Sequence, residues 1–358
     1  MTFEVAPAFA NGLIRVAVAD GVRSVQIGGG PVRVLDLAGG AVLEGRARWL
    51  RVSLRDGALQ VAGVRLSAAR LRPLGTHHLR INGHLYPGIL EVLRNGNGLT
   101  VVNELPLDAY LVGVLAAEAA DDWPVEALKA QAIAARTFAL YHRRLNAAKP
   151  FHLVASTAHQ RYAGSVPASS PLWLAVKETA GEVLRWEGQL FPAFYHADSG
   201  GHTEDPRKVF DAPNMPALKP VRSDFSAGAP HYAWSLGVPL SELAGVLRKG
   251  GISVGRILRL EVLERSRSLR VLRMAVHGTR GRATVRGVDL RRLLGARVLK
   301  STLFVVSVDG AYARFTGRGY GHGVGLSQWG AKGMAEQGYG YREILRFYYP
   351  GSILSTVR

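Results

Sequence analysis

Glu118 is the residue of this sequence best placed for acid chemistry. It follows the apolar run 111–117, and Ala119 and Ala120 come directly after it. A carboxylic acid beside apolar residues can lose enough hydration to stay protonated near neutral pH, as a glycosidic general acid must. A glutamate in such a place also serves as a helix-end cap or ion-pair partner, so both roles are open.

A second candidate feature is the pair of cations in segment 125–145, where Lys129 and Arg136 lie seven residues apart. This spacing places them two turns apart on one helix face, with Gln131 near its edge, where they could line a groove or form a solvated stripe. Their neighbours are apolar nearly all round the helix, which predicts burial and therefore partners for both charges.

Three histidines offer further chemistry. His196 and His202 flank the Gly200-Gly201 pair, and with Asp198 or Glu204 they could form a loop zinc site. Their spacing fits no strong metal motif, so we expect no metal here. His322 could act as a ligand, a base, a sugar-contacting residue or a structural hydrogen-bonding group.

The sequence lacks the motifs that characterise several reaction classes. The glycine-rich tail 317–325 has no Gly-Lys-Ser/Thr ending and no dinucleotide spacing, and no Gly-x-Ser-x-Gly elbow is present. The absence of cysteine excludes disulfides, thiolate metal sites and a cysteine nucleophile. Nucleic-acid binding would rest on charge alone, so we expect no specific nucleic-acid partner.

The pattern along the chain predicts both strands and helices. Short alternating apolar stretches separated by glycines predict strands from 13 to 72. In the tail 317–325 glycine alternates with larger residues, which predicts a strand with one bare face and an opposite face that presents Arg318, Tyr320 and His322 together. Other predicted elements are hairpins at 86–102 and 179–195, strands at 257–263 and 271–276, and helices from 107, at 125–145, from Ser327 to 335 and from 341 to before Pro350.

These elements predict an α+β fold with three parts. We expect a β-rich N-terminal segment at 1–76, a mixed helix and strand catalytic core at 77–215 and 317–358, and an inserted α/β subdomain at 216–316.

Composition limits the partners and the compartment. The 358 residues are 47% hydrophobic and 20% charged, as in an ordinary globular protein, and 45 Lys and Arg against 27 Asp and Glu give a formal charge of +18. That charge favours an anionic partner, although scattered basic residues also serve solubility. The longest apolar run is too short and too interrupted for a transmembrane segment, and the N-terminus shows no readable export signal.

Three stretches together resemble the stage II sporulation protein D family: 105–118, 126–137 and 317–330. Weaker similarities follow the same order, and the resemblance covers about residues 77–358. The Met-Pro that usually follows the family's glutamate is replaced by Ala119-Ala120, and the cysteine zinc ligands of some relatives are missing.

The resemblance implies a secreted peptidoglycan lytic transglycosylase of the cell envelope, a lyase that cleaves the bond between N-acetylmuramic acid (MurNAc) and N-acetylglucosamine (GlcNAc) in glycan strands. Glu118 corresponds to the family's catalytic acid, and one acid suffices for this reaction without a metal or organic cofactor. We expect a groove formed by the Glu118 loop, the Lys129 helix, segment 156–162 and the tail 317–328. The expected substrate-binding residues are Lys129, Arg136, Gln160, Tyr162, His196, Tyr320, His322 and Gln328.

Two alternatives stay open. Asp121 or Asp122 could supply a second carboxylate, which would turn the reaction into hydrolysis. Related amidase-enhancer proteins imply instead a non-catalytic wall-binding module that stimulates an N-acetylmuramoyl-L-alanine amidase.

Overall fold

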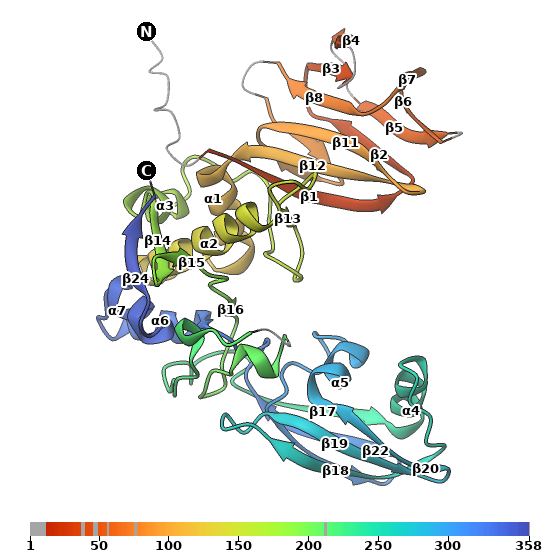
Figure 1. Cartoon of the computed structure of the whole chain (residues 1–358), viewed down its shortest axis with the longest axis vertical. Helices are drawn as coiled ribbons and strands as arrows, with labels where there is room; N and C mark the ends of the chain where they lie inside the picture. The colour runs from red at the N-terminus through yellow and green to blue at the C-terminus, as the bar shows by residue number, and fades with distance from the viewer. Residues whose placement is uncertain are drawn as a thin grey trace. The chain divides into compact units, whose positions relative to one another are not determined.

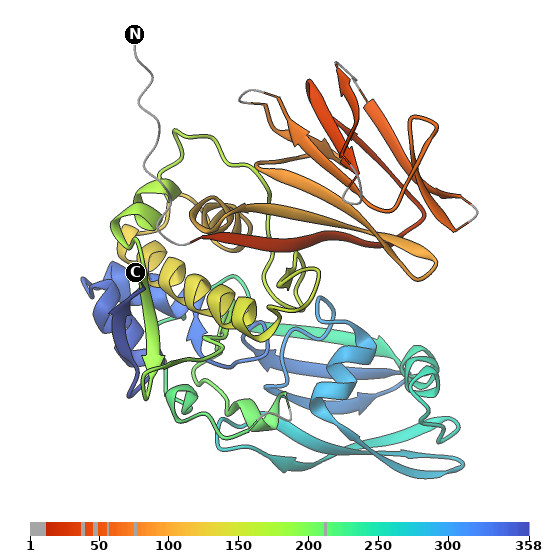
Figure 2. The ribbon, with the colours of Figure 1, turned by 45° about the horizontal axis from the view of Figure 1, so that its top comes forward.

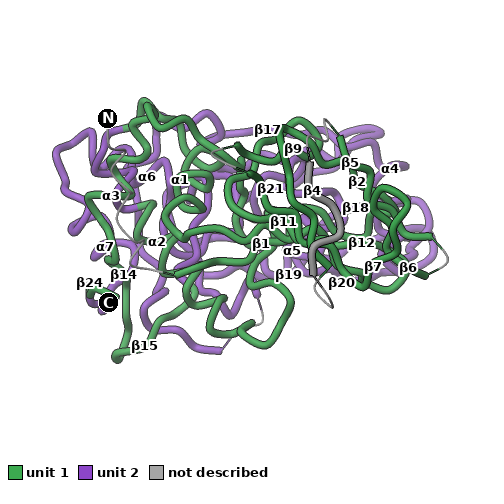
Figure 3. The backbone as a smooth tube through the Cα atoms, turned by 90° about the horizontal axis from the view of Figure 1, so that it is seen from above, with its two compact units in different colours: residues 1–123, 131–192, 354–358 green, residues 124–130, 193–353 purple. Residues whose placement is uncertain are grey.

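The structure is a computed structural model, and it describes residues 12–36, 40–45, 49–55, 57–74, 77–210 and 213–357. The chain divides into two compact units, coloured separately in Figure 3. The first unit comprises residues 1–123, 131–192 and 354–358, and the second comprises residues 124–130 and 193–353. Both contain helices and strands, which confirms the predicted α+β class.

Two sheets form the β-rich part of the first unit (Figure 1). One has the order β13-β1-β12-β11-β8-β3-β4 and the other has the order β10-β9-β2-β5-β6-β7. Their strands are β1 (Leu13–Val22), β2 (Ser24–Gly28), β3 (Val32–Asp36), β4 (Gly40–Gly45), β5 (Trp49–Arg55), β6 (Ala58–Val61), β7 (Val64–Leu66), β8 (Ala69–Pro73), β9 (Leu79–Ile81), β10 (His84–Tyr86), β11 (Ile89–Asn95), β12 (Gly98–Pro106) and β13 (Leu153–Val154).

The pairing of these strands changes the predicted domain boundary at residue 76. β1 pairs with β12, and β8 pairs with both β3 and β11, so strands from before and after residue 76 share one sheet. The predicted hairpin at 86–102 is confirmed, because β11 and β12 meet at the pair Asn95 and Gly98 across a two-residue turn.

A charge ladder crosses four neighbouring strands of the larger sheet. Arg15 of β1 forms ion pairs with Glu104 of β12 and Glu91 of β11, and Arg70 of β8 pairs with the same two carboxylates. Both glutamates are largely enclosed, so each charge depends on its partners. The ladder therefore favours this order of strands over a shifted one.

Helices complete the first unit. They are α1 (Leu107–Glu118), α2 (Val125–Leu145), whose first turns belong to the second unit, and α3 (Leu172–Glu178). α1 follows directly from β12 and packs against α3. Figure 2 shows α2, in yellow, along its length. A small sheet of order β15-β14-β24 contains β14 (Glu182–Trp186), β15 (Gln189–Leu190) and β24 (Ile353–Thr356), where β14 and β15 confirm the predicted hairpin at 179–195.

The second unit contains two three-stranded sheets with their own apolar core. The sheets have the orders β17-β22-β21 and β18-β19-β20, and their core residues run from Trp234 to Phe315. The strands are β17 (Ala233–Pro239), β18 (Ile257–Arg265), β19 (Val271–Gly278), β20 (Gly281–Arg286), β21 (Phe304–Asp309) and β22 (Tyr312–Arg318), and the helices packed on them are α4 (Leu240–Lys249) and α5 (Gly287–Leu294).

The rest of the second unit surrounds a short parallel pair of strands, β16 (Tyr195–His196) and β23 (Leu326–Ser327). The remaining elements are the 3₁₀ turns η1 (Pro206–Lys208) and η2 (Pro216–Leu218), α6 (Gln328–Glu336) and α7 (Tyr341–Tyr348). The Ser327 side chain accepts a hydrogen bond from the backbone N–H of Gly330 and caps α6, as predicted. The predicted core, 77–215 with 317–358, is thus divided between the two units.

The glycine-rich tail differs from its prediction. β22 ends at Arg318, and Gly319, Gly321, Gly323 and Gly325 all have positive φ angles, between 71° and 119°. These are left-handed conformations that a continuous strand cannot contain, so the prediction of one strand through 325 was wrong. Arg318, Tyr320 and His322 therefore do not share one strand face, and each has neighbours different from those of the other two.

No helix among the described residues is long and apolar enough to cross a membrane.

Candidate active site

Glu118 is the last residue of α1 and its side chain is partly buried. α1 is apolar on nearly all sides, and seven of its residues are buried, so the helix is fixed in the first unit up to its last turn. The Oε1 atom of Glu118 accepts a hydrogen bond from the backbone N–H of Arg161, at 2.9 Å. The structure thus brings Glu118 together with segment 156–162, two parts of the expected groove.

A buried hydrogen-bond network supports this segment. The hydroxyl of Tyr110 donates to Oε1 of Gln160 at 3.0 Å, and Nε2 of Gln160 donates to the carbonyl of Ala135 at 3.3 Å. The hydroxyl of Tyr162 donates to Oδ1 of Asn103 at 3.0 Å. Gln160 is 1% exposed and Tyr162 is 9% exposed. Both residues therefore position the loop that carries Arg161 rather than offering a surface to a ligand.

Tyr110 connects this network to Glu118. Its ring centroid lies 5.1 Å from that of Tyr162, and it is fully buried. Burial raises the pKa of Tyr110 well above its usual value, and the negative charge of Glu118 raises it further. The hydroxyl therefore stays protonated and remains a hydrogen-bond donor. Tyr110 and Asn103 were missed by the sequence analysis because both occur in apolar runs typical of core.

The environment of the Arg136 side chain differs from the one expected of a ligand-binding residue. Its side chain is 0% exposed, and its guanidinium donates to the carbonyls of Val176 at 3.1 Å and Glu182 at 3.2 Å. It also lies 3.7 Å from the carboxylate of Asp108. Burial lowers the pKa of Arg136, and the charge of Asp108 opposes this shift. The enclosed guanidinium joins α1, α2 and the α3–β14 segment, so direct contact with a substrate is not available to it.

Lys129 belongs to the second unit and has a partner of its own. Its Nζ atom lies 2.8 Å from Oε1 of Glu126 and 5.7 Å from the ring centroid of Tyr341. Glu126 also accepts a hydrogen bond from the backbone N–H of Tyr341. Lys129 is thus oriented by neighbours on α2 and α7.

His196 and His322 lie together in the second unit, with ring centroids 5.4 Å apart. The Nδ1 atom of His322 accepts a hydrogen bond from the backbone N–H of Val324 at 3.0 Å, and Nδ1 of His196 lies 3.1 Å from the carbonyl of Val324. Burial is the largest cause that lowers both pKa values, to about 3 for His322 and well below the usual range for His196. Both rings are therefore neutral at pH 7.

The two other predicted residues of the tail occupy separate positions. Tyr320 exchanges backbone hydrogen bonds with Asp198, and its ring lies 5.1 Å from that of His231. Gln328, the first residue of α6, is 5% exposed, and its Nε2 has no hydrogen-bond partner among the residues that the structure describes.

The loop between His196 and His202 does not gather metal ligands. Nδ1 of His202 lies 2.7 Å from the carbonyl of Thr203, and Oε2 of Glu204 accepts a hydrogen bond from Ser268. Across ranges 12–36, 40–45, 49–55, 57–74, 77–210 and 213–357, no group of three His, Asp or Glu side chains is arranged to hold a metal ion.

A cavity of about 530 Å³ lies beside the end of α1 in the first unit. Ala116, Ala119, Ala120 and Asp121 line one side of it, and segment 166–172 lines the other. Glu118 is not among its lining residues. The expected groove as a whole combines residues of both units and stays a prediction.

Comparison with known proteins gives two regional matches. A family model described as Stage II sporulation protein matches residues 95–186, which include Glu118, Lys129, Arg136, Gln160 and Tyr162. A domain of unknown function, DUF8618, matches residues 212–325.

Comparison with individual proteins extends these matches. An uncharacterized protein of Brachyspira hyodysenteriae is 34% identical over 272 residues, which are 76% of this chain and 72% of that protein. Stage II sporulation protein D of Bacillus amyloliquefaciens is 32% identical, covering 71% of this chain and 75% of that protein. The amidase enhancer of Bacillus subtilis is 30% identical, but the match spans only 40% of its length. The identity and coverage together show that this chain belongs to the stage II sporulation protein D family.

Proposed function

We propose that this protein is a peptidoglycan lytic transglycosylase of the cell envelope and that Glu118 is its catalytic acid and base. The observation that supports this most directly is the position of Glu118, fixed at the end of a buried helix and hydrogen-bonded to the backbone of Arg161. Family membership supports the same assignment, because Glu118 falls within the matched region.

The proposed reaction needs one carboxyl group used twice. Glu118 first donates its proton to the oxygen between C1 of MurNAc and C4 of GlcNAc, and the C1–O bond breaks. The 6-hydroxyl of the same MurNAc then attacks C1, and Glu118 accepts the hydroxyl proton. The products are a 1,6-anhydro-MurNAc end and a free GlcNAc 4-hydroxyl, and Glu118 returns to its protonated form.

The hydrogen bond from the backbone N–H of Arg161 would act between the two proton transfers of this reaction. After the first proton transfer Glu118 carries a negative charge, and a backbone N–H stabilises a carboxylate. The enclosed Tyr110, Gln160 and Tyr162 network holds the Arg161 backbone in place without taking part in proton transfer. Such preorganised donors avoid reorganisation during the reaction.

Four of the remaining predicted residues divide into two roles. Lys129 stays a proposed contact for the lactyl carboxylate of a muramic residue, and Tyr320 and His322 stay proposed glycan contacts. Arg136 is reassigned as a positioning residue, since its guanidinium is enclosed by backbone carbonyls and Asp108. It acts on Glu118 through α1, which carries Asp108 near its start.

The alternative is a non-catalytic module that binds wall glycan and stimulates an amidase. One observation favours it, namely the relative named amidase enhancer. The two functions differ in whether the purified protein alone breaks glycan strands.

The test is mass spectrometry of purified glycan strands, with and without stem peptides, after incubation with the wild-type protein and the variant Glu118→Gln. We expect anhydro-MurNAc ends from the wild type and a loss of at least about a hundredfold in their rate of formation in the variant. Glu336→Gln is the matched control, because Glu336 also ends a helix, α6, and is exposed.

The outcomes separate the candidate functions. Reducing ends in place of anhydro ends would indicate hydrolysis with a second carboxylate, such as Asp121. Intact strands that still bind the protein would favour the amidase enhancer. Equal activity of the Glu118 variant and the Glu336 control would remove Glu118 from the mechanism.

A further inference from the structure

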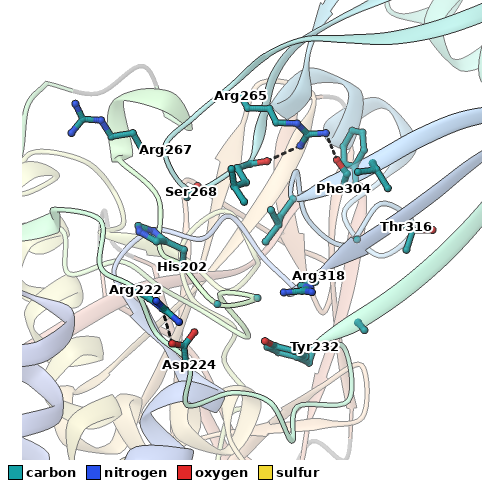
Figure 4. A pocket seen from close by; sticks show the side chains of 17 residues that line it. His202, Arg222, Asp224, Tyr232, Arg265, Arg267, Ser268, Phe304, Thr316 and Arg318 are labelled. Carbon is teal, nitrogen blue, oxygen red and sulfur yellow. Dashed lines mark hydrogen bonds and ion pairs between the residues drawn. The ribbon is translucent and has the colours of Figure 1, made fainter.

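A second cavity, of about 790 Å³, lies within the second unit and is separate from the residues proposed for catalysis (Figure 4). Three parts of the chain line it: the loop 200–202 with residues 222–224, the β18–β19 turn at 265–269, and adjoining residues of β17, β21 and β22. Most of these residues fall in the region matched by the domain of unknown function. The cavity is therefore a candidate site for that region.

The wall formed by the loop is held firmly. Gly200 has a φ of +69°, and a Cβ atom there would come within 2.9 Å of Arg318, so the loop backbone packs directly on β22. The fully buried guanidinium of Arg270 donates to the carbonyls of Ser199 and His202. His202 also forms a β-bridge with Arg222. The cavity is thus preformed rather than dependent on a mobile loop.

Four arginines give the cavity its charge: Arg222, Arg265, Arg267 and Arg318. Asp224 is its one carboxylate, so four positive charges and one negative charge leave +3. Asp224 pairs with Arg222 at 2.7 Å, and Arg265 donates to two backbone carbonyls. Within the described part of the chain, Arg318 and Arg267 form no ion pair.

Arg318 is the best oriented of these cations. Its Cζ atom lies 5.8 Å from the ring centroid of Tyr232, so the guanidinium is held beside an aromatic face. In Figure 4 Arg318 lies beside the ring of Tyr232. A planar guanidinium held in this way is suited to bind a carboxylate through two hydrogen bonds.

Much of the remaining exposed lining is apolar, which narrows the ligand class. Leu269 is 64% exposed and Val305 is 60% exposed, and Leu303 and Phe304 adjoin them. A ligand recognised only by charge, such as a polyol phosphate chain, would gain nothing from these side chains. A peptide with carboxylates and small apolar side chains would use both features.

We propose that this cavity binds the acidic stem peptide of peptidoglycan. Stem peptides carry alanine methyl groups that could contact Leu269 and Val305, and carboxylates that could contact Arg318. The choice of stem peptide over other acidic peptides rests on the proposed function. The cavity then makes the protein sensitive to whether glycan strands still bear peptides.

The test is isothermal titration calorimetry of the full chain with N-acetylated L-alanyl-γ-D-glutamyl-meso-diaminopimelic acid. We expect saturable binding by the wild type and by Glu118→Gln alike, so the result does not depend on catalysis. Arg318→Gln should weaken binding by about tenfold or more, because it removes a charge-assisted contact. Arg314→Gln is the matched control, since Arg314 is an exposed arginine on the same strand outside the cavity, and it should change binding by less than about twofold.

Circular dichroism would establish that both variants are folded. Absence of peptide binding, or equal weakening by Arg318→Gln and Arg314→Gln, would overturn the proposal. Equal affinity for a peptide whose glutamyl carboxylate is amidated would also overturn it. Stronger competition by oligomeric glycerol phosphate would assign the cavity to a phosphate polymer instead. Anhydro-end formation is measured separately, so failure here leaves the Glu118 mechanism standing, and the reverse also holds.

Discussion

Arg136→Gln provides the sharpest test of the reassignment of Arg136. In the structure the guanidinium satisfies the carbonyls of Val176 and Glu182 and lies beside Asp108. A hydrogen bond from a charged donor contributes about 1.5–3 kcal/mol. Removing one member of a buried charged pair costs about 3–5 kcal/mol. Because glutamine can keep at most part of these bonds, we expect the free energy of unfolding to fall by about 3–5 kcal/mol.

The assay is urea unfolding followed by circular dichroism, with hydrogen exchange of peptides from α2 and α3 to locate the change in the first unit. Arg144→Gln is the matched control, because Arg144 lies on the same helix and is exposed, with a single hydrogen bond to Gln189. Its expected effect is within about 0.5 kcal/mol.

Equal stability of the two variants would refute the reasoning. If Arg136→Gln kept full stability and lost glycan binding, this would indicate that Arg136 contacts the glycan directly. If it lost stability and its cleavage rate recovered at lower temperature, the positioning role would be supported.

Two further predictions concern packing and pH. Gly113→Ala should destabilise the first unit by about 1–3 kcal/mol, because a Cβ atom there would lie 2.4 Å from the ring of Tyr162; Gly245→Ala in α4, where no atom lies within 4 Å, should be neutral or slightly stabilising by thermal unfolding. Burial, with the charges of His159 and Lys149, lowers the pKa of His142 to about 4 in the folded chain. The unfolded chain therefore binds the proton first, and stability should fall as the pH drops from about 6.5 towards 4. His142→Phe should flatten this part of a urea-unfolding pH series, and an unchanged slope would contradict the assignment.

Local patterns predicted much of the secondary structure. The apolar spacing predicted α1 and α2, the Asn95 to Gly98 turn predicted the β11–β12 hairpin, and Ser327 predicted the start of α6. These features depend on residues close together in the sequence, so helix periodicity, turn chemistry and capping suffice to define them. The resemblance that identified Glu118 likewise rests on short contiguous motifs.

Other features depend on contacts between residues that are distant in the sequence. For these the sequence pattern predicted a structure different from the one observed. Period-two glycines are typical of a strand, but close packing against His196 and Arg270 selects left-handed loop conformations at Gly321 and Gly323. The seven-residue spacing of Lys129 and Arg136 predicted two cations that line one groove. In the structure Lys129 pairs with Glu126, whereas Arg136 is enclosed by backbone carbonyls and Asp108.

The sequence by itself determined the α+β class, the helices and hairpins near Glu118, and the family. Only the tertiary structure decided that Arg136 is enclosed by carbonyls from residues 176 and 182, and that Arg318 and Tyr232 share a cavity with the loop at Gly200. The physical reason is that burial and charge pairing depend on which distant segments pack together. The spacing of residues along the chain does not specify that packing.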